Sequence, residues 1–193
     1  MSAPDVPADL RDGAAHADAA NRLIAYGIDL VLLTVVVLAA AVVVSVVLGP
    51  TISFDPAAEN LSGAVTVHRG LAAVNAVVGT ALSGVYFVLS WWRRQATPGQ
   101  RLLRLRIWHA AGGTVPVRAA VLRWVLLGAP FALASGLVLG SGVETTLLWL
   151  LALVWDLALL VTTARDPRGR GLHDQASGTT VVKVLAAPPP RGG

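Results

Sequence analysis

The chain has 193 residues, of which 55% are hydrophobic and only 13% are charged. A soluble domain carries about 25% charged residues, so this composition is typical of a membrane protein. The net charge is +4, but the basic residues flank apolar stretches, where anionic lipid headgroups attract them, so the charge does not indicate nucleic-acid binding. There is no cysteine, which excludes disulfides, thiolate metal sites and cysteine nucleophiles.

Four apolar segments follow one another, each near the ~20 residues that cross about 30 Å of hydrocarbon. They cover residues 23–48, 71–92, 119–139 and 145–163. The first is long and lacks an A-x-A cleavage site, which favours a retained span over a signal peptide. Residues 1–20 and 185–193 are expected to be a disordered and a flexible tail. The sequence therefore predicts an all-α membrane protein, a bundle of four transmembrane helices within residues 21–184.

The basic residues lie on alternate sides of these spans. Between the second and third spans stand Arg93, Arg94, Arg101, Arg104, Arg106 and Arg118, and after the fourth stand Arg165, Arg168, Arg170, Lys183 and Arg191. The 50–70 loop holds only Arg69, and the 140–144 loop holds no basic residue. The positive-inside rule therefore predicts that both termini and the 93–118 loop face the cytoplasm.

The loops carry weaker signals. Prolines and a glycine interrupt residues 50–69, where little regular structure is expected, and residues 140–144 are expected to form a tight turn. In the 93–118 loop, Thr97 is a candidate N-cap with Pro98 at the first helical position. Residues 103–107 then alternate in polarity, as a half-buried strand does, and could pair with residues 179–184. The alternative for 98–108 is one amphipathic interfacial helix.

Charged side chains fall inside the predicted spans. Arg22 and Asp29 share one face of the first helix, Arg123 lies about 6 Å into the third span, and Asp156 lies about 12 Å into the fourth. Charges in a membrane face the bundle interior and pair, so these four are expected to contribute to one polar cluster, with Arg123–Asp156 as the first cross-helix pair. The cluster could be an ion or proton pathway, or a static salt bridge that fixes helix packing.

Other polar and aromatic residues of the spans have structural interpretations. The second span carries a stripe at spacings of three and four, which is typical of helix packing: Asn75, Gly79, Ser83, Tyr86 and Ser90. Tyr26, Trp91, Trp92 and Trp108 fall near predicted membrane interfaces. They are interpreted as an aromatic belt and not as a ligand cage.

His173 and Asp174 follow the fourth span and could form a proton relay or half of a metal site. No two histidines have ligand spacing on a shared helix, so neither a metal nor another cofactor is expected. The chain has no nucleophile elbow, no glycine-rich phosphate loop and no HExxH, so an enzyme is not expected.

These residues resemble the RDD family of bacterial membrane proteins, which is named for an arginine at the start of its first span and two aspartates. Arg22 and Asp29 match the first two, in NRLIAYGID, and Asp174 matches the last, in LHDQASGT. The stretch from Thr97 through Pro98, Gly99 and Arg101 to Arg106 resembles the family's TPGKRLLGLRV block. Arg123-Trp124 fits the arginine-containing start of the following span. Gln100 and Arg104 depart from the usual lysine and glycine.

The resemblance implies a polytopic protein of the bacterial inner membrane, for which transport of an unknown ligand is suggested. One hypothesis is a small transporter, by cation/proton exchange or proton-coupled movement of a solute, with Asp29 and Asp156 carrying the proton or cation. The other is a membrane scaffold or accessory subunit that binds anionic lipid headgroups or a partner through its basic face. A bundle of four spans is thin, so transport would call for a homo-oligomer.

Overall fold

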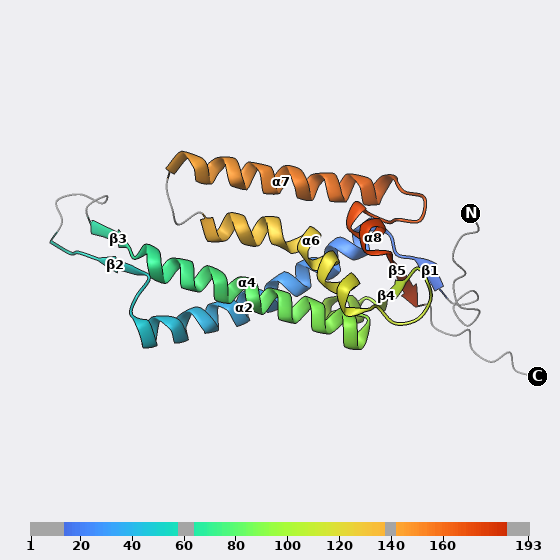
Figure 1. The fold of residues 1–193 in the computed structure, drawn as a ribbon, viewed down its shortest axis with the longest axis horizontal. Helices are drawn as coiled ribbons and strands as arrows, with labels where there is room; N and C mark the ends of the chain where they lie inside the picture. The colour runs from blue at the N-terminus through green and yellow to red at the C-terminus, as the bar shows by residue number, and fades with distance from the viewer. Residues whose placement is uncertain (1–13, 58–63, 138–141, 185–193) are drawn as a thin grey trace, which may run out of the picture.

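The computed structural model describes residues 14–57, 64–137 and 142–184. Four long helices lie side by side, α2 (Ala19–Leu48), α4 (Arg69–Arg94), α6 (Val117–Leu137) and α7 (Gly142–Arg165). A three-stranded sheet and two short helices cover one end of them, here called the sheet end, and a β-hairpin extends from the other, the hairpin end (Figure 1). The protein is thus mostly helical with small sheets.

Three of the described helices are long and apolar enough to cross a membrane: Ala19–Leu48, Arg69–Arg94 and, within α7, Leu147–Arg165. They correspond to the first, second and fourth predicted spans. The third predicted span corresponds to α6, which packs between α4 and α7. Side chains of α6 are described only as far as Gly128, so its crossing of the membrane stays a prediction.

The helices begin and end at recognisable caps. The Asp18 side chain accepts a hydrogen bond of 2.7 Å from the backbone N–H of Asn21 and so caps the start of α2. At the sheet end, α4 ends at Gln95, which has the left-handed backbone conformation. Two arginines lie in its last turn, where the negative end of the helix dipole stabilises cations. Of the turn predicted at 140–144, residues 142–144 belong to α7, which begins at Gly142, and residues 140 and 141 lie outside the described residues.

The sheet end is built from segments far apart in the sequence. Strand β5 (Thr179–Val184) lies in the middle and pairs antiparallel with β4 (Leu105–His109) on one side and β1 (Ala14–His16) on the other. The predicted pairing of the region at residues 103–107 with residues 179–184 is therefore confirmed. The alternative of one amphipathic helix over 98–108 is wrong, because the helix α5 (Pro98–Leu102) ends at Leu102 and strand β4 begins at Leu105.

Two sequence expectations are corrected by these strands. The segment 1–20 was expected to be disordered, but its described part forms β1 and the cap of α2, since β5 offers a free edge to it. The loop 50–69 was expected to have little regular structure, yet β2 (Ile52–Phe54) and β3 (Val65–Val67) pair there as a hairpin. Strands β1, β2 and β3 have only three residues each, too few to show a periodic pattern.

The polar stripe of α4 makes contacts between helices, as predicted. The Ser83 hydroxyl accepts a hydrogen bond of 3.2 Å from the indole Nε1 of Trp124 in α6. On the other side, a Cβ added at Gly79 would lie 3.4 Å from Val37 of α2, so the glycine permits close approach there. Tyr86, on the same stripe, reaches a carboxylate of α2 that is described below.

Candidate functional site

The carboxylate of Asp174 is the centre of the buried polar cluster at the sheet end. It lies in α8 (Leu172–Ser177) and is 0% exposed. The Nη1 of Arg22, in α2, donates to its Oδ2 at 2.8 Å, and the Nη1 of Arg123, in α6, donates to its Oδ1. One aspartate therefore joins the start of the first long helix to the third.

Backbone and hydroxyl groups complete this cluster. Arg22 also donates through Nε to the carbonyl of Ala17 and through Nη2 to the carbonyl of Val181 in β5, both at 3.1 Å. Arg123 donates to the hydroxyl of Thr179 at 2.7 Å, and its guanidinium carbon lies 5.1 Å from the ring centre of Trp91. A buried charge is tolerated only when it is paired and hydrogen-bonded, and both arginines meet that condition.

The charges around Asp174 and His173 set their protonation. Burial alone would raise the pKa of Asp174, but Arg123 and Arg22 outweigh it and hold the pKa at about 2. Burial, with the nearby Arg123, lowers the pKa of His173 to about 4. At neutral pH the carboxylate is ionised and the imidazole is neutral. The imidazole Nε2 lies 3.4 Å from Oδ2 of Asp174.

Asp29, the other motif carboxylate, is held by three donors and no cation among the described residues. The Tyr86 hydroxyl donates to its Oδ1 at 2.7 Å, the backbone N–H of Gly99 donates to the same oxygen at 2.8 Å, and the Thr97 hydroxyl donates to Oδ2. The side chain is 1% exposed. Asp29 therefore ties α2 to α4 and to the start of α5.

The turn Thr97-Pro98-Gly99 is shaped for this contact. Thr97 caps α5 in a capping box with Gln100, and Pro98 occupies the first turn. A Cβ added at Gly99 would lie 2.2 Å from the carbonyl oxygen of Ala25, so only glycine lets the turn approach α2 this closely. Arg101, in the last turn of α5, is exposed and takes no part.

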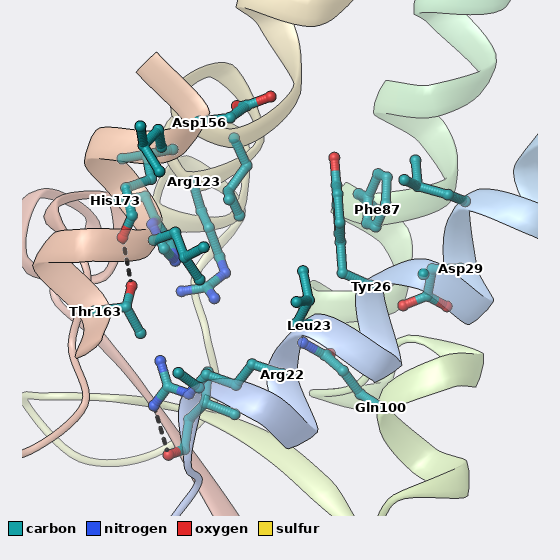
Figure 2. A pocket seen from close by; sticks show the side chains of 18 of the residues that line it. Arg22, Leu23, Tyr26, Asp29, Phe87, Gln100, Arg123, Asp156, Thr163 and His173 are labelled. Carbon is teal, nitrogen blue, oxygen red and sulfur yellow. Dashed lines mark hydrogen bonds between the residues drawn. The ribbon is translucent and has the colours of Figure 1, made fainter. Parts of the chain in front are cut away.

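A cavity of about 550 Å³ opens beside these two carboxylate clusters. Its lining is mostly apolar and comes from α2, α4, α6, α7 and the sheet end, with polar contributions from Arg22, Tyr26, Asp29, Gln100, Arg123, Asp156, Thr163 and His173. Figure 2 shows several of these side chains converging on it. The cavity lies where α2 and α7 face each other with little direct contact.

Asp156 lines this cavity from α7, but it does not pair as expected. The predicted Arg123–Asp156 ion pair is wrong, because Arg123 turns toward the sheet end and is taken by Asp174. In Figure 2 the Asp156 carboxylate points away from the Arg123 guanidinium. Among the described residues Asp156, which is half-buried, has neither a hydrogen bond nor an ion pair.

The expected single cluster is therefore divided into three parts. Arg22 and Arg123 join Asp174 and His173, Asp29 lies in its own set of donors, and Asp156 lies on the cavity wall with no partner among the described residues. All of these residues except Asp174 line the same cavity. The three parts therefore lie around the same cavity, although no hydrogen bond among the described residues joins one part to another.

The interpretation of the aromatic residues also changes. Trp91 was interpreted as part of an interfacial belt, but it is only 3% exposed and packs between Arg123 and Gln100. Tyr26 likewise lines the cavity and stacks on Phe87, with ring centres 6.0 Å apart. Trp92 is exposed, as a belt residue should be.

Sequence reasoning missed the donors that hold the two motif carboxylates. Tyr86 was placed on a packing stripe, and Thr179 was seen only as a strand residue. The available signal was arithmetic: two intramembrane arginines need a carboxylate, and Asp174 follows the fourth span within reach of the same membrane face. For Thr97 and Gly99 no periodic signal exists, because their contact with Asp29 depends on how α5 folds back.

Helices of this length and apolarity, bearing charged side chains that are buried and paired, define a multi-span membrane protein. No curated protein and no solved structure matches the chain. The model of the RDD family matches residues 16–178, and the chain belongs to that family. The match includes Arg22, Asp29 and Asp174, which all belong to the two carboxylate clusters described above.

Proposed function

We propose that this protein is a small transporter that moves a solute across the membrane in exchange for, or together with, a proton carried by Asp156. The observation that carries this proposal is the contrast between the carboxylates. Asp29 and Asp174 are saturated by donors, whereas Asp156 has no partner among the described residues and lines an open cavity. An intramembrane carboxylate without a partner is neutralised by a proton or a cation.

The motif residues have a supporting role in this proposal. Arg22, Arg123 and Asp174 lock the sheet end onto α2 and α6, and Asp29 locks α5 onto α2. These contacts keep the cavity wall in place while Asp156 binds and releases its proton or cation. This assigns the carrier role to Asp156 alone and removes Asp29 from it, since each Asp29 oxygen already accepts from a fixed donor.

The arrangement in the membrane follows from the charge distribution. We propose that α2, α4, α6 and α7 all cross the bacterial inner membrane and that the sheet end, with both termini, is cytoplasmic. The exposed arginines support this orientation, because all of those in the described residues except Arg69 lie at the sheet end: Arg93, Arg94, Arg101, Arg104, Arg106, Arg118, Arg165 and Arg168. A homo-oligomer would supply the wider path that four helices lack.

Proton flux in liposomes tests the proposal. Purified protein is inserted into vesicles that hold a pH-sensitive dye, and gradients of Na⁺, K⁺, Li⁺ and tetraethylammonium are imposed in turn. Flux above that of empty vesicles, lost in Asp156→Asn and kept in Asp55→Asn, is the expected result. Asp55 is the matched control because it is an exposed aspartate at the hairpin end. Equal flux through wild type and Asp156→Asn would remove Asp156 as the carrier.

A second candidate function is a non-enzymatic scaffold that binds anionic lipid headgroups. The exposed arginines of the sheet end favour it, since anionic headgroups attract them. Arg93 also makes a cation–π contact with Trp92, with its guanidinium carbon 5.2 Å from the ring centre. Lipid that co-purifies with the protein would then be enriched in anionic species. Replacing Arg101, Arg104 and Arg106 together by glutamine should abolish the enrichment, and unchanged lipid content would reject this candidate.

A further inference from the structure

The cavity has the size and character of a binding site for a small organic molecule. Its volume of about 550 Å³ lies within the roughly 300–1,000 Å³ of small-molecule pockets, and its lining is mostly apolar. A bare proton does not need such a space. The solute that Asp156 serves is therefore larger than a bare inorganic ion.

The charge balance around the cavity favours a cation. Arg22 and Arg123 are positive, and Asp29 and Asp174 are negative, so these four groups cancel. His173 is neutral because its ring is buried beside Arg123. Asp156 then leaves the described residues of the cavity and its two carboxylate clusters with a net charge of minus one. An occupant with a single positive charge makes the whole site neutral.

The wall offers the aromatic face of Tyr26 to such a cation, whereas the Trp91 ring already carries the Arg123 guanidinium. Tyr26, Phe87 and Trp91 all line the cavity and follow one another in contact, with ring centres 6.0 Å apart for the first pair and 5.2 Å for the second. In Figure 2 the Tyr26 ring stands between Phe87 and the side of the cavity that holds Arg123 and Asp156. Aromatic faces attract organic ammonium groups and contribute about 0.5–2 kcal/mol each, most when water is excluded.

The described residues do not favour an inorganic ion. They contain no group of three or more histidine, cysteine, aspartate or glutamate side chains that could hold a metal ion. A hard cation prefers several oxygen ligands in a tight shell. Of the two carboxylates that line this cavity, Asp29 already accepts from three donors, which leaves Asp156 in a wide apolar space. The site suits a diffuse charge on an apolar body.

We propose that the cavity between α2 and α7 binds a hydrophobic organic cation, of the quaternary ammonium or phosphonium type, with its charge at Asp156 and its body against Tyr26. This rests on the proposed function and names its substrate class. Entry is from the bilayer, because the rim carries leucines of both helices that are exposed outside a membrane: Leu23, Leu30, Leu153, Leu157 and Leu160. Such a molecule dissolves in the lipid and reaches the rim without crossing water.

Equilibrium binding to the full chain in lipid nanodiscs tests this substrate class without transport. Tetraphenylphosphonium is the probe, and tetraphenylborate, which has nearly the same shape and the opposite charge, is its control. Saturable binding of the cation above that of empty nanodiscs, with no saturable binding of the anion, is expected. Saturable binding of the borate alone would overturn the proposal and point to the arginines, and absence of binding by either probe would also overturn it.

Three variants locate the site. Asp156→Asn should weaken phosphonium binding by about tenfold. Tyr26→Leu should weaken it by about threefold to thirtyfold, and Tyr26→Phe, which keeps the ring, should bind as the wild type does. Wild-type affinity in folded Asp156→Asn would refute the assignment. Phosphonium that fails to bind, together with alkali-driven proton flux that needs Asp156, would reject this substrate class and leave the proposed function standing.

Discussion

Arg22 and Asp174 lie 2.8 Å apart, Nη1 to Oδ2, although 152 positions separate them in the chain. The arginine stands near the start of α2, and the aspartate stands in α8, after all four long helices. The pair therefore joins the first long helix, α2, to the short helix α8 near the other end of the described chain. Arg123 binds the other oxygen of the same carboxylate, which makes Asp174 a shared counter-charge.

Loss of the Asp174 charge should destabilise the protein strongly. Asp174→Asn leaves two buried guanidinium groups without a carboxylate, and breaking a buried ion pair in this way costs about 3–5 kcal/mol. For a chain of this size the Tm should fall by on the order of 10 °C. Thermal unfolding in detergent, followed by tryptophan fluorescence, measures the change. Asp55→Asn, at an exposed site, should leave the Tm unchanged.

A double-mutant cycle separates pairing from packing at this site. If Asp174 acts mainly as a counter-charge, Arg123→Met should recover part of the stability that Asp174→Asn loses, because one uncompensated charge is removed. Strictly additive losses in the double variant would show that the two side chains do not interact.

The close approach of α5 to α2 depends on Gly99. In Gly99→Ala the new methyl would lie 2.2 Å from the carbonyl oxygen of Ala25 and 2.9 Å from Cγ of Asp29, so the turn must move. The expected cost is about 1–3 kcal/mol. Gly27→Ala is the matched control in α2, where nothing lies within 4 Å and alanine should raise stability by about 0.5–1 kcal/mol. Equal Tm values for the two variants would contradict the close contact.

The stability of the sheet end should depend on pH through His173. Its pKa is about 4 in the fold, below the ordinary 6.5, because burial and Arg123 disfavour the charged ring. The unfolded chain then binds more protons between these values, so stability is complete above pH 6.5 and is lost as the pH falls to about 4. Relative to His173→Gln, the wild type should lose about 3 kcal/mol over this window. Parallel pH profiles for the two proteins would refute this.

A second loss should follow at lower pH. The pKa of Asp174 is about 2 in the fold and ordinarily about 3.9, so its contribution is present above pH 4 and lost as the pH falls toward 2. The two steps do not overlap, and unfolding scans at intervals of half a pH unit should resolve them. Only the lower step should disappear in Asp174→Asn variants that fold.

Neutralising Asp156 should not destabilise the protein. Since the carboxylate has no partner among the described residues, Asp156→Asn breaks no described hydrogen bond and removes a charge from an apolar wall. The Tm should stay within about 2 °C of the wild type or rise. A fall comparable to that of Asp174→Asn would mean that Asp156 braces the helices, which is the scaffold interpretation.

The sequence predicted the parts of the fold that periodicity and composition report. The spans of α2, α4 and α7 follow from apolar length, and the strand at Leu105–His109 follows from the alternation of Leu105, Arg106 and Ile107, which are buried, exposed and buried. The cap at Thr97 follows from local chemistry. Strand β1 and the hairpin could not be predicted, because three-residue strands form where a partner edge is offered.

The candidate site could be predicted as a set of residues but not as a set of pairs. Depth along each helix predicted one polar cluster of Arg22, Asp29, Arg123 and Asp156, and in the structure the four residues line one cavity without forming that cluster. It could not tell which way each side chain turns. Asp174 outcompeted Asp156 for Arg123 because α8 folds back under α6, a tertiary contact without a local signal.

The central position of β5 has a consequence for how the molecule is made. Strands β1 and β4 have no partner strand until β5 has been synthesised, up to residue 184. Arg22 and Arg123 have no counter-charge until Asp174 has been synthesised. At about 5–20 residues per second, Arg22 is exposed for roughly ten seconds or more after its own synthesis. Truncation before α8, which removes both Asp174 and β5, should therefore leave helices with unpaired arginines, a state that membrane proteases and chaperones can distinguish from the finished protein.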